Sequence, residues 1–381
     1  MNAKQLRCRA CDHNSSAPVL LQYDNMPATA QGLPTLETLE SDHGEYLEVL
    51  QCTGCGLVQL SNSPVSYYRD VIRAAAFSPE MGKFRLSQFE EWASQHRLRG
   101  KKVLEIGCGK GEYLALLQTA GIEAFGIEHA PESVTTCQQA GLHAAQGYLG
   151  DDIAHAFNGF EFDGFVCLNF MEHWPEPRQS LHALLPMLKD DAVGLIEVPN
   201  FDMIVEKGLF SEFIADHLLY FTEQTLRVFL ENNGFEVLEC QPVWQDYILS
   251  AVVRKRKVMD LSFFSNYRET ISQLLHRYID RFTDGEVAVW GAGHQSLAVI
   301  SLADIAHRVE YVVDSATFKQ GKFTPASHLP IVSPQQLETH PVAALIVMAA
   351  SYSDEVARII RTQYSQIQYV AILREDGLEE V

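Results

Sequence analysis

The stretch V-L-E-I-G-C-G-K-G-E-Y-L, residues 103–114, runs from a short apolar segment through three glycines at alternate positions into a segment with helical spacing. This pattern predicts a strand, a tight turn and a helix. Because the glycines remove side chains from the turn, backbone N–H groups and the helix N-terminus can face a ligand, and they favour an anionic group. The stretch therefore predicts a ligand site within an α/β fold.

Two types of ligand compete for this turn. A dinucleotide fingerprint requires Gly-x-Gly-x-x-Gly, whereas the turn here is Gly107-x-Gly109-x-Gly111, with Glu105 two residues before it. The next strand, E-A-F-G-I-E, ends at Glu128, where an open α/β sheet places a carboxylate that binds ribose hydroxyls. Residues 103–128 resemble the cofactor-binding half of the class I S-adenosylmethionine-dependent methyltransferases. This resemblance implies that the loop holds the methionine part of the cofactor and Glu128 its sugar; a dehydrogenase and a purely packing turn are the alternatives.

The composition is that of a globular protein. A chain of 381 residues with 47% hydrophobic content is long enough for two to three domains. The formal net charge of −20 disfavours a nucleic-acid partner, since that association depends on clustered Lys and Arg. The start, M-N-A-K-Q-L-R-C, has no apolar signal region, and the longest apolar run, residues 343–350, is too short to cross a bilayer. We expect a cytoplasmic protein without a membrane partner.

Four of the eight cysteines form two pairs, Cys8-x-x-Cys11 and Cys52-x-x-Cys55. Each such turn can direct two thiolates at one ion, and two turns complete a tetrahedral site, so the spacing predicts zinc. With four thiolates there is no open position, and the ion is expected to be structural. Two unrelated surface pairs are the alternative.

Residues 101–256 alternate between strand-like and helical patterns. Five strand-like runs are K-V-L-E-I-G, E-A-F-G-I-E, H-A-A-Q-G, D-G-F-V-C-L-N and V-G-L-I-E-V-P-N, and helices are expected at 112–120, 131–140 and 176–188. After a further helix, F-E-V-L-E-C and Y-I-L-S-A-V-V predict a β-hairpin. Five parallel strands and a closing antiparallel hairpin make up the seven-stranded sheet of class I methyltransferases.

A second α/β unit is expected after a helix at residues 261–282. It carries Gly291-x-Gly293-x-x-Ser296 followed by Asp314, which resembles a degraded dinucleotide fingerprint. The fold class predicted for the two larger domains is therefore α/β. The predicted organisation consists of a zinc-binding module (1–62), a helical lead-in (63–100), a methyltransferase domain (101–256) and a C-terminal Rossmann-like domain for substrate binding (257–381).

The order of these parts resembles the nucleotide-sugar C-methyltransferases, which act on keto-deoxysugars. The resemblance covers essentially the whole chain and rests on these motifs: C-R-A-C with C-T-G-C-G-L-V-Q-L, Y-Y-R-D, M-E-H-W-P-E-P, I-E-V-P-N, D-H-L-L-Y-F-T, V-W-G-A-G-H-Q-S, and V-V-D-S-A-T-F-K-Q-G-K-F with L-P-I-V-S-P. The chain departs from the family at Asp216, where Glu is usual, and at Gln295, where Lys is common. Pro325-Ala326 replaces Pro-Gly, and the Tyr-rich segment after Tyr68 is altered.

The resemblance implies a histidine-generated enolate. His217 is the candidate base, because an imidazole titrates near neutrality, and the adjacent Asp216 is expected to raise its basicity or share the proton. His173 would polarise the ketone or steady the enolate oxygen. Further site residues are Asn169 at the methionine end of the cofactor, Asn200 at the sugar, and Tyr68 and Tyr220 at the enolate oxygen.

A nucleoside diphosphate would bring negative charge onto an acidic protein, so local cations are expected to offset it. Lys319 and Lys322 are the candidates, with His294 as a further substrate-binding residue in the second glycine turn. The expected partner is thus a small molecule, bound by a monomer or homodimer. Two alternatives remain open: an O- or N-methyltransferase on another metabolite, and an NAD(P)-dependent dehydrogenase. A zinc-ribbon interaction module is excluded by the net charge and by the extent of the α/β core.

Overall fold

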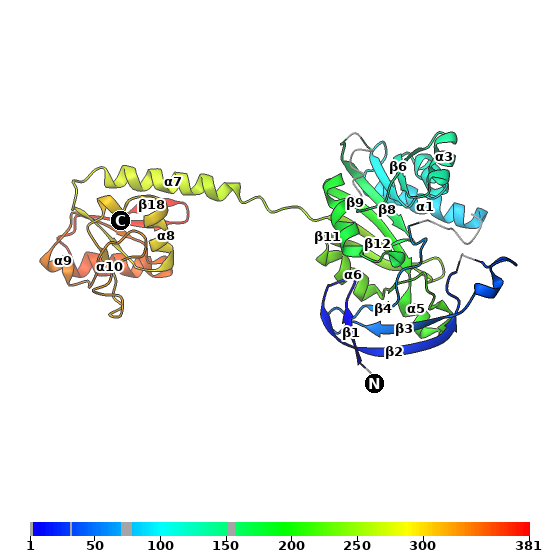
Figure 1. Ribbon diagram of the computed structural model, residues 1–381. Helices are drawn as coiled ribbons and strands as arrows, with labels where there is room; N and C mark the ends of the chain where they lie inside the picture. The colour runs from blue at the N-terminus through cyan, green and yellow to red at the C-terminus, as the bar shows by residue number, and fades with distance from the viewer. Residues whose placement is uncertain (1–2, 31–32, 70–77, 151–156, 158) are drawn as a thin grey trace. The chain divides into compact units, whose positions relative to one another are not determined.

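The computed structural model describes residues 3–30, 33–69, 78–150, 157 and 159–381. The chain divides into two compact units, residues 1–257 and 258–381, and each is described by itself below (Figure 1). Asp70, the last residue of the Y-Y-R-D motif, and the segment up to residue 77 lie outside the described residues.

The first unit contains an antiparallel sheet that begins at the N-terminus. Its strand order is β1-β2-β3-β4-β10. The strands are β1 (Ala3–Arg7), β2 (Asn14–Met26), β3 (Glu45–Gln51), β4 (Val58–Leu60) and β10 (Leu219–Tyr220). The last strand comes from far along the chain and pairs Leu219 with Gln59. The cysteine-bearing module therefore shares a sheet with the D-H-L-L-Y-F-T segment.

The second sheet of this unit has seven strands in the order β11-β12-β9-β8-β5-β6-β7. They are β5 (Lys102–Ile106), β6 (Glu123–Glu128), β7 (His143–Gln146), β8 (Phe162–Leu168), β9 (Leu188–Pro199), β11 (Phe235–Val243) and β12 (Ile248–Lys255). Five strands are parallel, and the hairpin of β11 and β12 closes the sheet antiparallel to β9. This is the α/β methyltransferase sheet, and the predicted fold class is confirmed.

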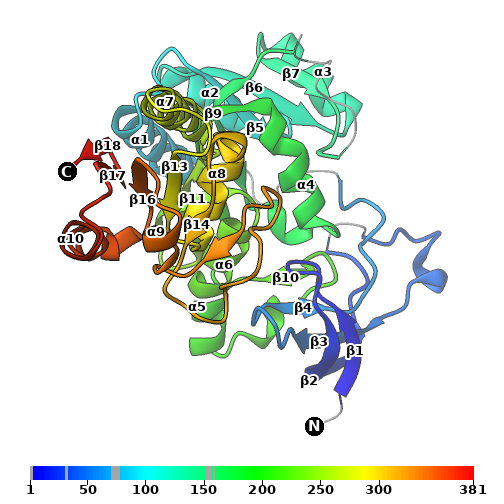
Figure 2. The ribbon, with the colours of Figure 1, turned by 90° about the vertical axis from the view of Figure 1, so that its left-hand side faces the viewer.

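Helices connect the strands of this unit (Figures 1 and 2). They are α1 (Pro79–Gln95), α2 (Glu112–Thr119), α3 (Pro131–Gln139), α4 (Pro177–Leu184), α5 (Phe201–Glu206) and α6 (Glu223–Asn232). The helix predicted over 176–188 is shorter in the structure. It ends at Leu184 and continues as a 3-10 turn, Leu185–Met187, because Pro186 has no N–H for an α-helical hydrogen bond.

Helix α1 is anchored by a buried ion pair. The guanidinium of Arg85 contacts the carboxylate of Glu197 on β9, and both side chains are fully buried. Gln88, one turn further along α1, donates a hydrogen bond of 2.6 Å to the same carboxylate. The lead-in helix is thereby attached to the strand that precedes Asn200.

The second unit is another open α/β sheet (Figure 2), with the order β15-β14-β13-β16-β17-β18. Its strands are β13 (Val287–Trp290), β14 (Val312–Val313), β15 (Ile331–Val332), β16 (Ala344–Val347), β17 (Tyr369–Arg374) and β18 (Gly377–Glu380), and only β18 is antiparallel. Its helices are α7 (Ser262–Ile279), α8 (His294–Leu302), α9 (Gln336–Thr339) and α10 (Ser353–Gln363). Alternate residues of β13 pack on opposite sides: Val287 joins a cluster with α7 and α8, and Ala288 joins one with α9 and α10. Both faces are thus covered, as parallel sheets require.

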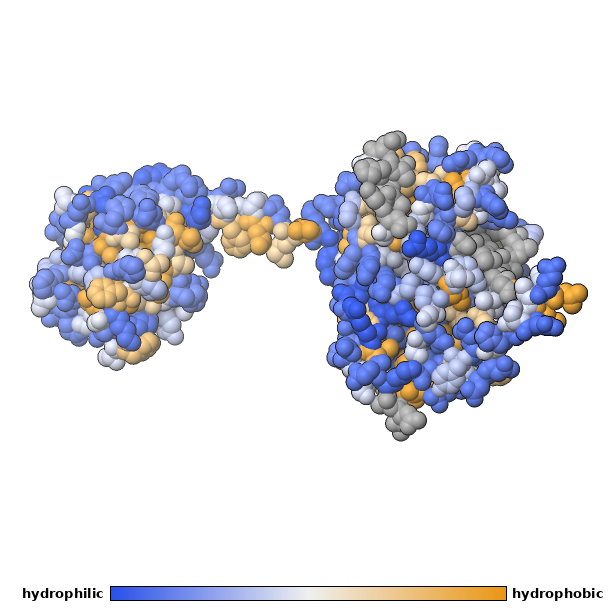
Figure 3. Space-filling model, viewed as in Figure 1, coloured by the Kyte–Doolittle hydropathy of each residue, from blue (hydrophilic) through white to orange (hydrophobic). Residues whose placement is uncertain are grey.

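The visible surface is mainly hydrophilic, in keeping with the net charge (Figure 3). An exception is the start of α7, where the rings of Phe263 and Phe264 stack on each other with centroids 4.1 Å apart and remain more than half exposed. Exposed apolar groups of this kind are typical of surfaces that bind other molecules. Among the described residues, none of the helices is both long and apolar enough to cross a membrane.

Candidate active site

The glycine turn connects β5 to α2 at the carboxyl end of the sheet. Gly107, Gly109 and Gly111 all have positive φ, at 73°, 56° and 91°. A Cβ on Gly111 would lie 2.5 Å from a methyl carbon of Leu142 and 2.9 Å from the sulfur of Cys137. Both the backbone conformation and the packing therefore require a residue without a side chain at Gly111.

Glu128, at the end of β6, holds this turn in shape. One oxygen of its carboxylate accepts a hydrogen bond of 2.9 Å from the N–H of Gly109, and the other accepts one of 2.9 Å from the N–H of Ala130. The side chain is 1% exposed. The carboxylate thus shapes the turn from beneath through both of its oxygens. Glu105, also buried, lies on β5 in register with Gly126 of β6.

A narrow cavity of about 10 Å³ lies beside the glycine turn, at the ends of β5, β6, β7 and β8. It is lined by Arg69, Ile106, Gly107, Ile127, His129, Gly147, Tyr148, Leu149, Phe170 and Trp174. Of these lining residues, only Gly107 was predicted from the sequence as a site residue. The available signal was positional: His129, Tyr148 and Phe170 each follow closely on a predicted strand, where ligands of open α/β sheets bind.

Tyr68 contacts two residues that line this cavity, Arg69 and Tyr148. Its hydroxyl accepts a hydrogen bond of 3.1 Å from Nε of Arg69, and its ring meets that of Tyr148 edge-on, with centroids 5.9 Å apart. The guanidinium of Arg69 lies 4.9 Å from the centre of the Tyr148 ring, within the range of a cation–π contact. Two aromatic rings and a cation thus stand next to the proposed cofactor site.

Asn169 directly follows β8 and has a positive φ of 48°. Its N–H donates a hydrogen bond of 2.8 Å to the carbonyl of Glu197 on β9. A left-handed backbone at a residue other than glycine is uncommon and is concentrated at ligand sites. The strand end that carries Asn169 leads straight into the histidine segment.

His173 belongs to a 3-10 turn, η3 (Met171–His173), and lies against His217, which precedes β10. The two rings have centroids 4.8 Å apart and planes inclined by 76°. Nδ1 of His173 is 2.8 Å from the backbone carbonyl of Asp216, so this nitrogen carries the hydrogen and donates it. A second bond of 2.9 Å, from the N–H of Leu218 to the carbonyl of Glu172, fixes the same two segments.

The surroundings keep both imidazoles neutral. Burial lowers the pKa of His173, although the carbonyl and charge of Asp216 act in the opposite direction. Burial and the neighbouring His173 lower the pKa of His217 to about 3. Burial raises the pKa of Glu172, which sits beside them, to about 8. Both histidines are therefore neutral before a substrate binds, and each has a nitrogen that can accept a proton.

From the sequence, Asp216 was expected to raise the basicity of His217, but in the structure its carboxylate binds other groups. Its carboxylate accepts hydrogen bonds from the N–H of Ala30 at 2.8 Å and from the hydroxyl of Tyr67 at 2.7 Å. The pKa of His217 is lowered instead of raised, because burial outweighs any effect of a neighbouring carboxylate. Asp216 thus fixes the loop around the histidines.

Tyr220 and Asn200 also take part in the fold itself. The hydroxyl of Tyr220 accepts from the N–H of Ile214 at 3.1 Å, and its ring packs on Phe213 within a buried cluster. Burial raises the pKa of Tyr220 above its usual range. Asn200 caps α5: its side-chain oxygen accepts from the N–H of Asp202 at 3.1 Å, and its amide donates to the carbonyl of Asp246 at 2.8 Å. Neither residue lines the cavity described above.

The predicted substrate residues of the second unit surround its own glycine turn. Asp314, at the end of β14, accepts a hydrogen bond of 2.8 Å from the N–H of Ala292, much as Glu128 does for Gly109. Lys319 pairs with the same carboxylate at 2.8 Å, so its charge is already neutralised. His294, the first residue of α8, and Lys322 are exposed.

The four cysteines converge as expected for a metal site. Their sulfur atoms all lie within 4.8 Å of one another, with Cys8 and Cys55 3.7 Å apart and Cys11 and Cys52 3.6 Å apart. A tetrahedron with zinc–sulfur bonds of about 2.3 Å has edges of about 3.8 Å, so the spacing fits zinc. The N–H of Gly54 also donates a hydrogen bond of 3.3 Å to the sulfur of Cys52.

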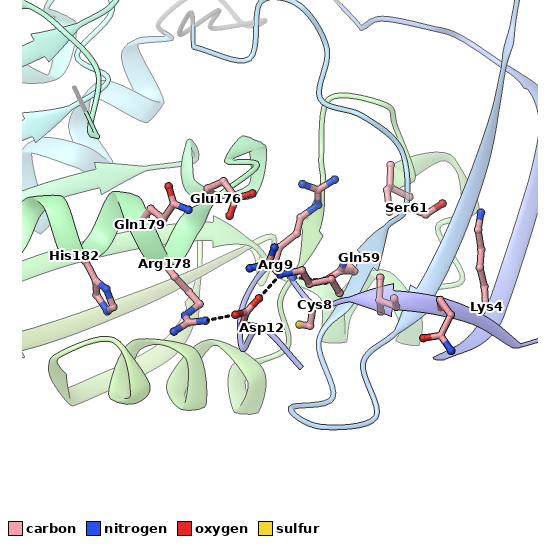
Figure 4. Close-up of a pocket in the computed structure, with 14 residues that line it drawn as sticks. Lys4, Cys8, Arg9, Asp12, Gln59, Ser61, Glu176, Arg178, Gln179 and His182 are labelled. Carbon is pink, nitrogen blue, oxygen red and sulfur yellow. Dashed lines mark hydrogen bonds and ion pairs between the residues drawn. The ribbon is translucent and has the colours of Figure 1, made fainter. Parts of the chain in front are cut away.

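Arg9, between Cys8 and Cys11, connects this site to the histidine segment. Its guanidinium donates to the carbonyl of Pro175 at 3.0 Å and to the carbonyl of Asn62 at 2.8 Å. It borders a pocket of 530 Å³ between β1, β4 and α4, where Arg178 and Asp12 also approach each other (Figure 4). The turn that carries His173 is thus attached to the cysteine module.

Comparison with known proteins agrees with this arrangement. Residues 80–240 match the family model of a methyltransferase domain, and residues 250–371 match that of a C-methyltransferase C-terminal domain. The chain is 22% identical to the C-methyltransferase NovU of Streptomyces niveus, over 92% of this chain and 90% of that protein. It is 32% identical to a ubiquinone biosynthesis O-methyltransferase of Erwinia tasmaniensis, over 26% of this chain and 43% of that enzyme. Among solved structures, magnesium protoporphyrin IX methyltransferase from Synechocystis with bound S-adenosylhomocysteine (SAH) covers 49% of this chain and 90% of its own, at 17% identity and a TM-score of 0.38.

These findings favour a methyltransferase over the alternative of an NAD(P)-dependent dehydrogenase. Both family models describe methyltransferases, and together they span the central sheet and most of the second unit. S-adenosylmethionine, the cofactor of such enzymes, is the ligand predicted from the sequence for the glycine turn and Glu128. The chain is an S-adenosylmethionine-dependent methyltransferase that combines a class I methyltransferase domain with the C-terminal domain of the C-methyltransferases.

Proposed function

We propose that the protein transfers a methyl group to a carbon atom next to the ketone of a nucleotide-linked keto-deoxysugar. The observation that carries the proposal is the pair of neutral imidazoles, His173 and His217, which lies just beyond the strand end occupied by Asn169. Methylation at carbon requires removal of a proton beside a carbonyl, whereas the sulfonium methyl is already electrophilic. The full-length similarity to a protein named as a C-methyltransferase supports transfer to carbon.

His217 is proposed as the base that takes this proton. A neutral imidazole has a free lone pair, and the negative charge that develops on the enolate would favour the imidazolium once the substrate is bound. His173 is held by Asp216 so that Nε2 is its unprotonated nitrogen, which allows it to share the proton. Tyr68, next to Arg69 and Tyr148, is the preferred hydroxyl candidate for the enolate oxygen, since the hydroxyl of Tyr220 is bonded to Ile214.

The remaining assignments extend this proposal. S-adenosylmethionine binds at the glycine turn, with Glu128 on its ribose and Asn169 near its methionine end. One structural zinc ion binds to Cys8, Cys11, Cys52 and Cys55. In the second unit, Lys322 and His294 are exposed and available to a phosphate group, whereas Lys319 would first have to exchange its contact with Asp314.

Hydrogen exchange tests the proposed chemistry directly. With a keto-sugar nucleotide and SAH in deuterated water, the wild-type protein should place deuterium on the carbon beside the ketone. His217→Asn should keep SAH affinity and lower the exchange rate by about 10²- to 10⁴-fold, the usual contribution of a general base. His182→Asn, the same substitution at an exposed position of α4, is the control and should exchange normally.

The same experiment separates the alternatives. Exchange that persists in His217→Asn and vanishes in His173→Asn would reverse the roles of the two histidines. If the wild-type protein exchanges no keto-sugar, transfer to oxygen or nitrogen of another metabolite becomes the better assignment.

A further inference from the structure

Glu172, a residue of the M-E-H-W-P-E-P motif with no role so far, lies in a cluster with His173 and His217. One potential ligand atom from each of the three residues lies within 4.8 Å of the other two. Two of them are neighbours on η3 (Met171–His173), and the third precedes β10. Two hydrogen bonds between these segments, one from the side chain of His173 to Asp216 and one between the backbones of Leu218 and Glu172, hold the three side chains together.

The hydrogen bonding of the cluster leaves its metal-binding atoms available. Because Nδ1 of His173 donates to the carbonyl of Asp216, its Nε2 carries a lone pair, and this nitrogen lies 3.9 Å from a carboxylate oxygen of Glu172. An imidazole whose second nitrogen donates to a backbone carbonyl is the usual arrangement of a metal-binding histidine. The other oxygen of Glu172 is buried and accepts no hydrogen bond from the described residues, although the side chain is only 2% exposed.

The distances suit an ion after a small adjustment. Ligand atoms bound at about 2.1 Å in a tetrahedral arrangement are about 3.4 Å apart, so the pair at 3.9 Å has to close by about 0.5 Å. All separations are within 4.8 Å, so none has to close by more than about 1.4 Å, which side-chain rotation can supply. Both histidines remain partly exposed, so an ion held by these three groups would keep open positions for water or another ligand.

We propose that Glu172, His173 and His217 form a second metal site, which binds a divalent transition-metal ion such as Zn²⁺, Co²⁺ or Ni²⁺. Two imidazoles and one carboxylate are the ligands that these ions prefer, whereas Mg²⁺ and Ca²⁺ prefer oxygen alone. This site has three ligands and open positions, unlike the closed set of four cysteines. It is therefore the weaker site, and a mild chelator should empty it first.

The position of the site predicts inhibition. The lone pair with which His217 would accept a proton is the same one that would bind the ion, so metal binding and proton abstraction exclude each other. This consequence rests on the proposed function, whereas the binding of the ion does not. Divalent transition metals should thus be reversible inhibitors of the exchange reaction.

Titration with Co²⁺ tests the site without relying on activity. The purified protein, with its cysteine site filled and loosely bound metal removed, should bind one further Co²⁺ per chain and develop a visible absorption band without thiolate-to-cobalt charge transfer. Glu172→Gln and His217→Asn should each lower the affinity at least about 10-fold, since each removes a direct ligand. His182→Asn is the control and should bind Co²⁺ as the wild type does. Circular dichroism of both variants checks that they fold, and two independent variants keep the test valid if one does not.

Two outcomes would overturn the inference: no Co²⁺ bound beyond the cysteine site, or unchanged affinity in both Glu172→Gln and His217→Asn. Either result leaves the proposed function standing if the wild-type protein still exchanges deuterium and His217→Asn does not. Conversely, Co²⁺ binding that depends on Glu172 in a protein that exchanges no keto-sugar would support the metal site and refute the proposed function. In a protein with both properties, exchange should decline in proportion to the Co²⁺ bound, and EDTA should restore it.

Discussion

Replacing Glu128 by Gln tests how the cofactor loop is built. The carboxylate of Glu128 accepts one hydrogen bond from Gly109 and one from Ala130, each 2.9 Å long. A glutamine side chain keeps one acceptor oxygen, but its NH₂ group cannot accept from the second N–H. At least one charge-assisted hydrogen bond is lost, which is worth about 1.5–3 kcal/mol.

This loss should appear in cofactor affinity, because the bond to Gly109 shapes the turn that surrounds the ligand. At about 1.4 kcal/mol per factor of ten, Glu128→Gln should bind SAH about 10- to 150-fold more weakly in isothermal titration. Glu132→Gln, at an exposed position in the first turn of α3, makes the same chemical change and should leave the affinity unaltered. Affinity within twofold of the wild type in Glu128→Gln would refute the assignment of this carboxylate to the cofactor site.

Two further predictions concern stability. Cys52→Ser should lower metal content and thermal stability together, since all four sulfur atoms are needed to complete the tetrahedron; purified wild-type protein without zinc in elemental analysis would contradict the site. Glu197→Gln should cost about 3–5 kcal/mol of unfolding free energy in urea denaturation, because it leaves the fully buried charge of Arg85 without its partner. Glu236→Gln, which breaks an exposed pair on β11, should cost less than about 1 kcal/mol, and equal effects of the two substitutions would contradict the argument.

The features that could be predicted from the sequence are those whose residues lie close together along the chain. The glycine turn and Glu128 are separated by one helix, and a tight turn without side chains needs glycine wherever it occurs, as the contacts around Gly111 show. The hairpin of β11 and β12 was likewise visible because no helix pattern separates its two strands. Cysteine spacing indicated the metal site for the same reason, since each turn supplies two ligands within four residues.

Roles that depend on contacts between distant residues could not be predicted. Asn200 and Tyr220 have side chains suited to a sugar or an enolate, yet in the structure one caps α5 and the other bonds to Ile214. The residue type is compatible with either role, and only tertiary packing decides between them. Tyr148 shows the opposite case: its residue type indicates no role, and only its position after the predicted strand that became β7 marks it as a residue of the cavity beside the glycine turn.

The position of β10 explains how the cysteine module contributes to the histidine site. Leu219 pairs with Gln59 of β4, and the carbonyl of Leu218 accepts a hydrogen bond of 3.0 Å from the N–H of Leu60. His217 therefore lies two residues before a strand whose partner starts three residues after Cys55. Arg9, inside the first cysteine turn, holds Pro175 on the other histidine segment. A metal ion that orders the two cysteine turns would thus order both walls of the histidine site, although it contacts neither the cofactor nor the substrate.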